Sequence, residues 1–246
     1  MIRAVTIDCW GTLLIDGPAA DDRYRRQRLS GVQSVLTDAA VPVEPWVLER
    51  AYGEMARRLA AVWQRMRDVP VQEHVGLLLD GVEDGLRQRL PAGVLAALVE
   101  AYAKPILTVL PVADAGAAAA LDTLAARGLI LGVVSNIMRT PGLVLREVFD
   151  RLGLLAPLKV VTFSDECGIR KPDPEIFRLT LRQVGVAPES AVHVGDDPVL
   201  DVEGAKDAGM RVIQVVPNGR ATSPVRPDLV ITGFAELPAA LERLES

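Results

Sequence analysis

After Pro111, helical and strand patterns alternate along the sequence, and this alternation limits the fold more than any other feature. Alternating units of this kind build a parallel sheet that is covered by helices on both faces. The expected strands are short apolar runs rich in β-branched residues, and the expected helices have apolar residues at three- and four-residue spacing. We predict strands at 2–7, 129–134, 158–163, 191–194, 211–216 and 229–232, with helices at 113–127, 143–152, 174–184, 200–208 and 234–244.

The first strand is separated from the others by a long stretch that is helical throughout. Apolar residues recur at helical spacing over 21–36, 45–67, 71–79 and 91–103. Pro45 and Pro91 suit the first turn of a helix, where a missing N–H leaves no hydrogen bond unmade. We therefore predict two domains. An α/β core resembling a Rossmann fold, with a parallel sheet between helices, is formed by 1–16 and 108–246, and an all-helical cap is formed by 17–107.

The composition suits a globular chain that acts on a small molecule. The 246 residues include 27 Lys and Arg against 32 Asp and Glu, a net charge of −5, which argues against a broad surface for nucleic acid or an anionic membrane. Two cysteines give no disulfide framework, and no apolar run approaches the ~20 residues of a membrane span. We expect a cytoplasmic monomer or homodimer that has neither nucleic acid nor a membrane as a partner.

Polar residues follow four of the predicted strands, at the edge of a parallel sheet where ligands bind. Any one of them alone fits a turn or a helix cap. Their occurrence after four strands in turn indicates one site to which each strand contributes. The residues are Asp8 after the first strand, Ser135 and Asn136 at the end of the second, Lys171 after the third, and Asp196, Asp197 and Asp201 after the fourth.

These side chains suit phosphoryl transfer. A carboxylate such as Asp8 can attack phosphorus and form an aspartyl-phosphate, which splits a difficult displacement into two steps. Because attacker and substrate are both anionic, a cation must screen them, and Mg²⁺ prefers the oxygen ligands that Asp8 and Asp196 offer, together with Asp197 or Asp201. Ser135 and Lys171 can hold the charge that develops on the transferred group.

The four segments resemble the motifs of the haloacid dehalogenase (HAD) superfamily, in a form with a helical (C1-type) cap inserted after the first motif. The resemblance rests on Asp8, Ser135, the run Lys171-Pro172-Asp173-Pro174 and the run from Gly195 to Asp201. It implies a hydrolase with a HAD-like core. It also implies that Asp8, Ser135 and Lys171 are catalytic, that Thr12, Asn136 and Trp10 contact the substrate, and that Mg²⁺ binds Asp8, the Trp10 backbone carbonyl, Asp196 and either Asp197 or Asp201.

One position departs from the phosphatases that the chain resembles. They carry a second aspartate two residues after the first, as a general acid for the leaving group, and this chain has Trp10 there. Indole cannot deliver a proton at neutral pH, so ordinary phosphate esters should react about 10²–10⁴-fold more slowly. Either the substrate has a good leaving group, such as an acyl phosphate, or the cap supplies the acid. Tyr24, Glu73 and His74 are candidates, although each also fits a plain helix surface.

Trp10 leaves a second reading open. The 2-haloacid dehalogenases of the superfamily have an aromatic residue at this place, form an ester on the aspartate and need no metal. They lack the first acid of the fourth motif, however, whereas this chain keeps Asp196, and Phe177 stands where they carry a tyrosine. We therefore predict a Mg²⁺-dependent phosphohydrolase of a small metabolite. The alternatives are a dehalogenase, or a catalytically weak binding protein with this fold.

Overall fold

A six-stranded parallel sheet, in the order β5-β4-β1-β6-β7-β8, forms the centre of the molecule. The structure is a computed structural model that describes residues 1–15, 20–217 and 225–245. The first strand returns to the middle of the sheet, where Ile7 pairs with Val133 on one side and Val194 on the other. All six predicted strands are confirmed to within two residues: β1 (Ala4–Ile7), β4 (Ile130–Ser135), β5 (Leu158–Phe163), β6 (Ala191–Gly195), β7 (Arg211–Val215) and β8 (Leu229–Ile231).

Helices cover both faces of this sheet, so its central strands are buried along their whole length. All four residues of β1 and all five of β6 are buried. Residues of α6 (Ala117–Ala126), α7 (Gly142–Arg151) and α11 (Leu237–Glu245) belong to the larger of two hydrophobic clusters. Residues of α9 (Pro174–Gln183) and α10 (Gly204–Asp207) belong to the smaller one, on the other face.

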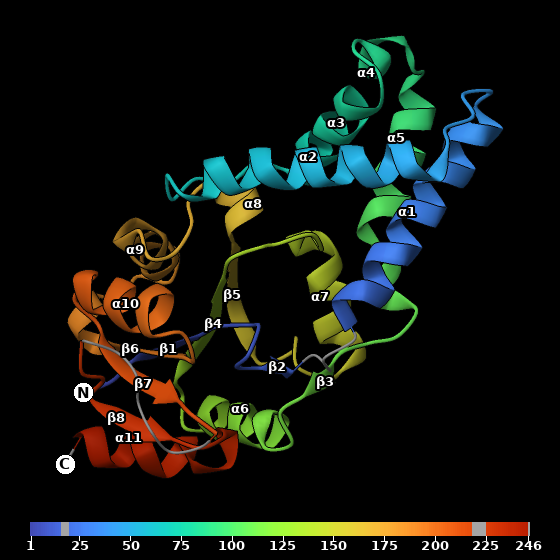
Figure 1. Cartoon of the computed structure of the whole chain (residues 1–246). Helices are drawn as coiled ribbons and strands as arrows, with labels where there is room; N and C mark the ends of the chain where they lie inside the picture. Colours follow the sequence, from blue (N-terminus) through green and yellow to red (C-terminus); the bar gives the residue numbers. More distant parts are fainter. Residues whose placement is uncertain (16–19, 218–224, 246) are drawn as a thin grey trace.

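Five helices gather at one end of the molecule, beyond the carboxyl edge of the sheet (Figure 1). We call them the helical layer: α1 (Ala20–Asp38), α2 (Pro45–Trp63), α3 (Val71–Val82), α4 (Leu86–Arg89) and α5 (Ala92–Ala103). Within it, α1 packs on α5 and α2 packs on α3. None of the helices in the described ranges is long and apolar enough to cross a membrane. The extent of the cap, 17–107, stays a prediction, and part of its first connection, 16–19, lies outside the described residues.

Two short strands that the sequence pattern did not predict join the helical layer to the core. Leu14–Ile15 (β2) pairs antiparallel with Val112–Ala113 (β3), so the two connections run side by side. A single 3₁₀ turn, Pro105–Leu107, follows α5. Strands of two residues are too short to show alternation, and their pairing depends on tertiary contacts.

The predicted helix at 200–208 is wrong in detail, because two short elements replace it. Pro198–Glu203 forms a π-helical turn, and α10 follows it directly. The Asp197 carboxylate begins the turn by accepting hydrogen bonds from the amides of Val199 and Leu200, each at 2.8 Å. A further short helix, α8 (Ser164–Cys167), and 3₁₀ turns at Pro188–Ser190 and Phe234–Glu236 complete the described core.

Candidate active site

The carboxyl ends of three adjacent strands carry the candidate site. Asp8 directly follows β1, Ser135 ends β4, and Asp196 directly follows β6. Lys171 reaches the same place from the loop after β5. The sheet order thus brings together residues that lie far apart in the sequence, as the sequence pattern predicts.

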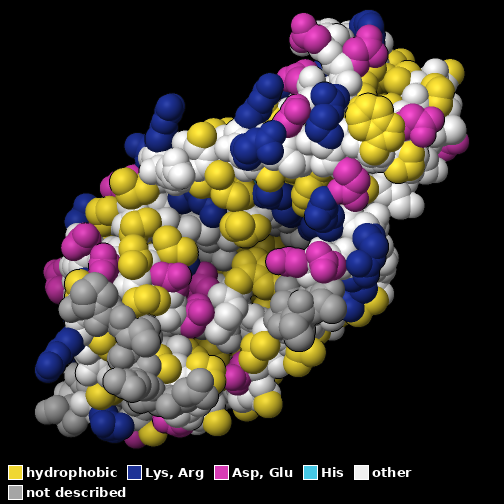
Figure 2. Space-filling view, viewed as in Figure 1, with side chains coloured by type: hydrophobic (Ala, Val, Ile, Leu, Met, Phe, Trp, Pro, Cys, Tyr) yellow, Lys and Arg dark blue, Asp and Glu magenta, His cyan; other side chains and the backbone are white. Residues whose placement is uncertain are grey.

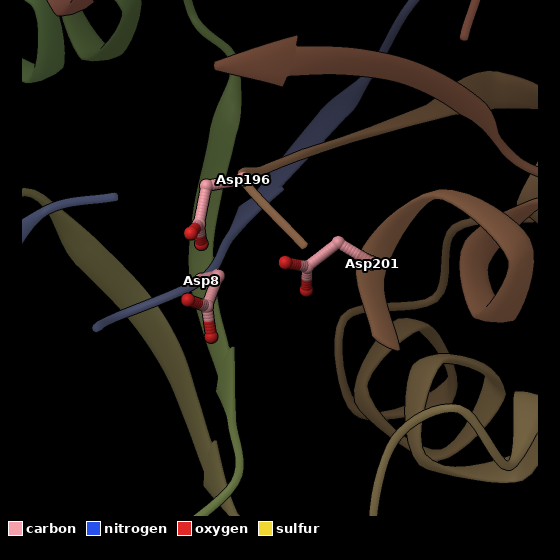
Figure 3. A group of neighbouring side chains, drawn as sticks. All are labelled: Asp8, Asp196 and Asp201. Atoms are coloured by element: carbon pink, nitrogen blue, oxygen red, sulfur yellow. The ribbon is translucent and has the colours of Figure 1, made fainter. Parts of the chain in front are cut away.

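Three carboxylates lie close together at this edge, and those of Asp196 and Asp201 extend toward Asp8 (Figure 3). Asp8, Asp196 and Asp201 each offer one oxygen, and these oxygens all lie within 4.8 Å of one another. Two glycines make the cluster compact. A Cβ on Gly11, whose φ is +79°, would lie 2.5 Å from Asp196 Oδ2, and a Cβ on Gly195 would lie 2.3 Å from Asp201 Cγ.

Lys171 bridges two of the three carboxylates. Its buried ammonium contacts Asp8 Oδ1 and lies 2.6 Å from Asp201 Oδ1. Asn136 fixes the backbone of Lys171 in both directions. Its Oδ1 accepts the Lys171 amide at 2.8 Å, and its Nδ2 donates to the Lys171 carbonyl at 3.0 Å. Asn136 therefore ties the end of β4 to the lysine loop, in addition to any contact with a substrate.

Burial and charge set the protonation of the cluster. Burial raises the pKa of the Asp8 carboxyl to about 7, although Lys171 opposes the rise and Asp201 adds to it. Burial and the neighbouring Asp201 also raise the pKa of Asp196. Burial alone would raise the pKa of Asp201, but Lys171 and His193 hold it below its ordinary value. The cluster therefore has more negative charge than one lysine balances.

His193 supports the cluster from inside the sheet. It is fully buried in β6, where its Nε2 lies 3.0 Å from Asp201 Oδ1 and its Nδ1 lies 2.9 Å from Thr6 Oγ1 on the neighbouring strand. Thr6 and His193 are register partners of β1 and β6. A buried histidine of the sheet thus holds a residue of the site.

The remaining sequence-predicted residues take different positions. Asp201 belongs to the acidic cluster, whereas one oxygen of Asp197 is used to begin the π-helical turn. Thr12 donates from Oγ1 to Asp196 Oδ1 at 3.1 Å and so orients that carboxylate. Gln214, which the sequence did not single out, donates to the Asp196 carbonyl at 3.0 Å, and its buried Oε1 lacks a hydrogen-bond partner among the described residues.

A cavity of about 400 Å³ lies beside the cluster, with Trp10 and Gly11 in its wall. Figure 2 shows the hollow between the helical layer and the core. Arg28 is buried there, and it donates to the Tyr102 carbonyl at 2.9 Å and to Thr140 Oγ1 at 3.0 Å. The lining residues are Trp10, Gly11, Ile15, Asp21, Tyr24, Arg28, Ile106, Met138, Arg139 and Thr140.

The three candidate proton donors of the cap are placed differently from one another. Tyr24 is buried in the cavity wall, and its hydroxyl donates to the Val109 carbonyl at 2.7 Å. Glu73 pairs with Arg87 on the surface of the helical layer. His74 is buried beside Tyr102, and burial lowers its pKa to about 4. The expectation of a plain helix surface is therefore wrong for Tyr24 and His74, because each packs its ring into the interior.

The donor set fits a hard divalent cation. Carboxylate oxygens are the ligands that Mg²⁺ prefers, and three of them converge with a negative charge that Lys171 only partly offsets. The glycines at 11 and 195 leave the space that the carboxylates need. Asp8, Asp196 and Asp201 are the residues that would hold the ion.

Known proteins are similar to this chain over most of its length. Residues 2–209 match the family model described as haloacid dehalogenase-like hydrolase. Phosphoglycolate phosphatase of Rhodospirillum rubrum is 32% identical over 225 residues, which cover 92% of this chain and 83% of the relative. Phosphoserine phosphatase of Thermus thermophilus is 42% identical over 112 residues, which are 45% of this chain and 44% of that enzyme, so the match spans less than half of it.

A solved structure covers the chain almost completely. The crystal structure of 2-haloacid dehalogenase from Pseudomonas syringae pv. Tomato has a TM-score of 0.73 and 26% sequence identity, and the match covers 99% of this chain and 100% of that one. Phosphatases and a dehalogenase are thus both among the similar proteins.

Proposed function

Since the chain belongs to the haloacid dehalogenase-like hydrolases, we propose that it is a Mg²⁺-dependent phosphohydrolase of a small metabolite, acting through an aspartyl-phosphate on Asp8. The observation that carries this proposal is the convergence of Asp196 and Asp201 on Asp8. Displacement of halide by one carboxylate needs no cation between attacker and substrate, whereas attack on a phosphate dianion does. The acidic cluster can therefore serve phosphoryl transfer by holding a cation, whereas halide displacement does not need it.

The chain's own residues account for both steps of this reaction. An Asp8 oxygen attacks phosphorus, the bond from phosphorus to the leaving oxygen breaks, and the leaving group departs with the electron pair. Water then attacks the phosphorus of the aspartyl-phosphate, which releases inorganic phosphate and restores Asp8. Lys171 opposes the rise in the Asp8 pKa that burial causes and, with Ser135, stabilises charge on the transferred group. Mg²⁺, when bound, would neutralise charge between the carboxylates and the phosphoryl oxygens.

Trp10 favours a substrate whose leaving group departs without a proton. An acyl phosphate or another anhydride meets this condition, because a carboxylate is a far better leaving group than an alkoxide. Tyr24 is the candidate proton donor from the cap that lies in the cavity wall, but its hydroxyl donates a hydrogen bond to the Val109 carbonyl. The rate of an ordinary ester should therefore be limited by its leaving group.

The cavity supports a small, anionic substrate. Among the described residues of its wall, Arg28 and Arg139 contribute two positive charges and Asp21 contributes one carboxylate. Guanidinium groups recognise carboxylates and phosphates through paired hydrogen bonds. The names of two relatives refer to phosphoglycolate and phosphoserine, which are both small phosphorylated carboxylic acids. We propose that this chain also acts on a small phosphorylated carboxylic acid, with its carboxylate toward the arginines, but with its phosphoryl group in an anhydride, because Trp10 disfavours ordinary esters.

One substrate panel tests the proposal. Acetyl phosphate, phosphoglycolate, p-nitrophenyl phosphate and 2-chloropropionate are each assayed with Mg²⁺ or with EDTA, for the native chain and for Asp8→Asn. We expect phosphate release from acetyl phosphate that requires both Mg²⁺ and Asp8. If a folded protein that binds Mg²⁺ releases neither phosphate nor halide from any of the four substrates, a binding protein is favoured instead.

A 2-haloacid dehalogenase is the second candidate, because two observations favour it. Trp10 places an aromatic ring beside the nucleophile, and a solved structure similar over the whole chain is a 2-haloacid dehalogenase. In this reading Asp8 displaces halide from carbon and forms an ester that water hydrolyses. Halide release from 2-chloropropionate in EDTA would establish this function and overturn the phosphohydrolase.

A further inference from the structure

The segment between α2 and α3 is joined to the core at the loop that leads to Lys171. The Asp68 amide donates to the Gly168 carbonyl at 3.1 Å, and the Arg170 amide donates to the Met66 carbonyl at 3.1 Å. Arg67 and Ile169 form an antiparallel bridge between these bonds. The helical layer therefore contacts the core here, in addition to its two chain connections and the contact of Arg28 with Thr140.

Asp68 is the centre of this contact, and its carboxylate is satisfied on both oxygens. Oδ2 accepts from Arg170 Nη1 at 2.6 Å and from the Ser164 hydroxyl. Oδ1 accepts from Trp63 Nε1 and from the Val69 amide, each at 2.9 Å. Both charged side chains are buried. Removing one partner of a buried ion pair leaves an uncompensated charge, so the pair must form whenever the two segments meet.

Arg170 and Ser164, the partners of Asp68, also form hydrogen bonds with the loop that follows Ser135. Arg170 Nη1 also donates to the Ile137 carbonyl at 2.6 Å, and Ser164 Oγ accepts the Ile137 amide at 2.8 Å. Both polar groups of the Ile137 backbone are thus held by partners of Asp68. Asn136, the preceding residue, is the one that fixes the Lys171 backbone.

We infer that Asp68, a residue of the helical layer, is a positioning residue for the reaction, because it holds the loops of Ser135 and Lys171 in one arrangement. The inference rests on the proposed function for the roles of Ser135 and Lys171. Displacement of a catalytic group by about 1 Å can cost about 10²-fold in rate. A movement of this end of the helical layer either carries the lysine loop with it or breaks a buried ion pair.

The test compares Asp68→Asn with Arg67→Ala. Asparagine keeps the shape of Asp68 and removes its charge. Arg67 is an exposed neighbour that pairs with Asp173 at 2.9 Å and joins the same two segments from outside. We measure kcat and KM for acetyl phosphate with Mg²⁺, and hydrogen exchange of the Ile137 and Lys171 amides.

For Asp68→Asn we expect kcat to fall by about tenfold or more, with a smaller change in KM and faster exchange at both amides. Arg67→Ala should stay within about twofold of the native values, since exposed ion pairs contribute little. A folded Asp68→Asn with native kcat and native exchange would overturn the inference.

Ser164→Ala keeps the inference testable if Asp68→Asn does not fold. It removes the hydroxyl between Asp68 and Ile137 without leaving a buried charge, and we expect a smaller change in the same direction. Native kcat and native Ile137 exchange in Ser164→Ala would count against the inference. If the native chain releases no phosphate, the proposed function fails, and the exchange comparison alone decides whether Asp68 holds the two loops.

Discussion

At the scale of single residues, we propose that Trp10 restricts which leaving groups the site can handle. The residue lines the cavity next to the acidic cluster, and the resemblance to phosphatases places their general acid at this position. Indole donates a hydrogen bond but does not transfer its proton at neutral pH. The acidic cluster can therefore be intact while the turnover of ordinary esters is slow.

An acid at this position should restore ester hydrolysis. We expect Trp10→Asp to raise the rate with p-nitrophenyl phosphate by about tenfold or more, since general acid catalysis contributes about 10²–10⁴-fold. Trp10→Asn is the control, because it opens similar space without an ionisable proton, and it should show no gain. An unchanged rate in a folded Trp10→Asp would mean that Trp10 is not what limits ester hydrolysis.

Asp165 gives a prediction about stability and pH. Burial raises the pKa of its carboxyl to about 6, although the Gly142 amide donates to Oδ2 at 3.1 Å. Its buried Oδ1 lacks a hydrogen-bond partner among the described residues. Because the folded pKa lies above the ordinary 3.8, the folded state binds the proton more tightly, and stability is lost as pH rises from about 4 through about 6.

Asp165→Asn removes this charge and can keep the acceptor for Gly142. We expect the free energy of unfolding, measured in urea, to rise by roughly 1–2 kcal/mol near pH 7.5, with a smaller gain near pH 4.5. Glu166→Gln, at the adjacent exposed acid that pairs with Arg146, should give no such gain. A variant less stable than the native chain near pH 7.5 would contradict the prediction.

At the scale of elements, the turn after β6 determines whether the acidic cluster forms. The π-helical turn folds back so closely that the Asp201 side chain packs on Gly195. That contact lets Asp201 Oδ2 accept the Asp197 amide at 3.0 Å while Oδ1 faces Lys171. The geometry requires a residue without a side chain at position 195.

A methyl group at this position should therefore displace Asp201. We expect Gly195→Ala to lose most of the rise in melting temperature that Mg²⁺ gives the native chain, and to lose stability by about 1–3 kcal/mol from overpacking. Gly93→Ala in α5 is the matched control, because a Cβ there meets no atom within 4 Å. It should keep the Mg²⁺ effect and gain up to about 1 kcal/mol. An unchanged Mg²⁺ effect in Gly195→Ala would show that Asp201 does not hold the ion.

The sequence predicted the elements well where burial alone defines them. The central sheet strands are buried runs rich in β-branched residues, and the polar residues after the strands predicted that Asp8, Lys171, Asp196 and Asp201 would meet. The β2–β3 pair and the π-helical turn escaped prediction. Their conformation depends on which segments lie next to each other in space. Segments of two to six residues are too short to show the hydrophobic periodicity from which a helix or a strand is predicted.

At the scale of the whole molecule, the helical layer was predictable as helices but not in its relation to the site. Asp68 and Arg170 lie 102 residues apart and look like solvated charges in the sequence. Helical periodicity does not say which acid at a helix end will be buried, nor which arginine will meet it. Arg28 and Arg139 likewise enter one cavity only through the packing of α1 on the loop after β4.

The assembled molecule places an acidic cluster, a lysine and a basic cavity at one edge of the sheet. The central claim is that Asp8 becomes phosphorylated in a Mg²⁺-dependent reaction. The most direct test is mass spectrometry of the Asp8 peptide after rapid acid quench of the chain with acetyl phosphate. Our account predicts the mass of one phosphoryl group on Asp8 with Mg²⁺ and none with EDTA or in Asp8→Asn. No phosphoryl adduct with Mg²⁺, together with a 1-carboxyethyl ester of Asp8 when 2-chloropropionate is supplied in EDTA, would contradict it.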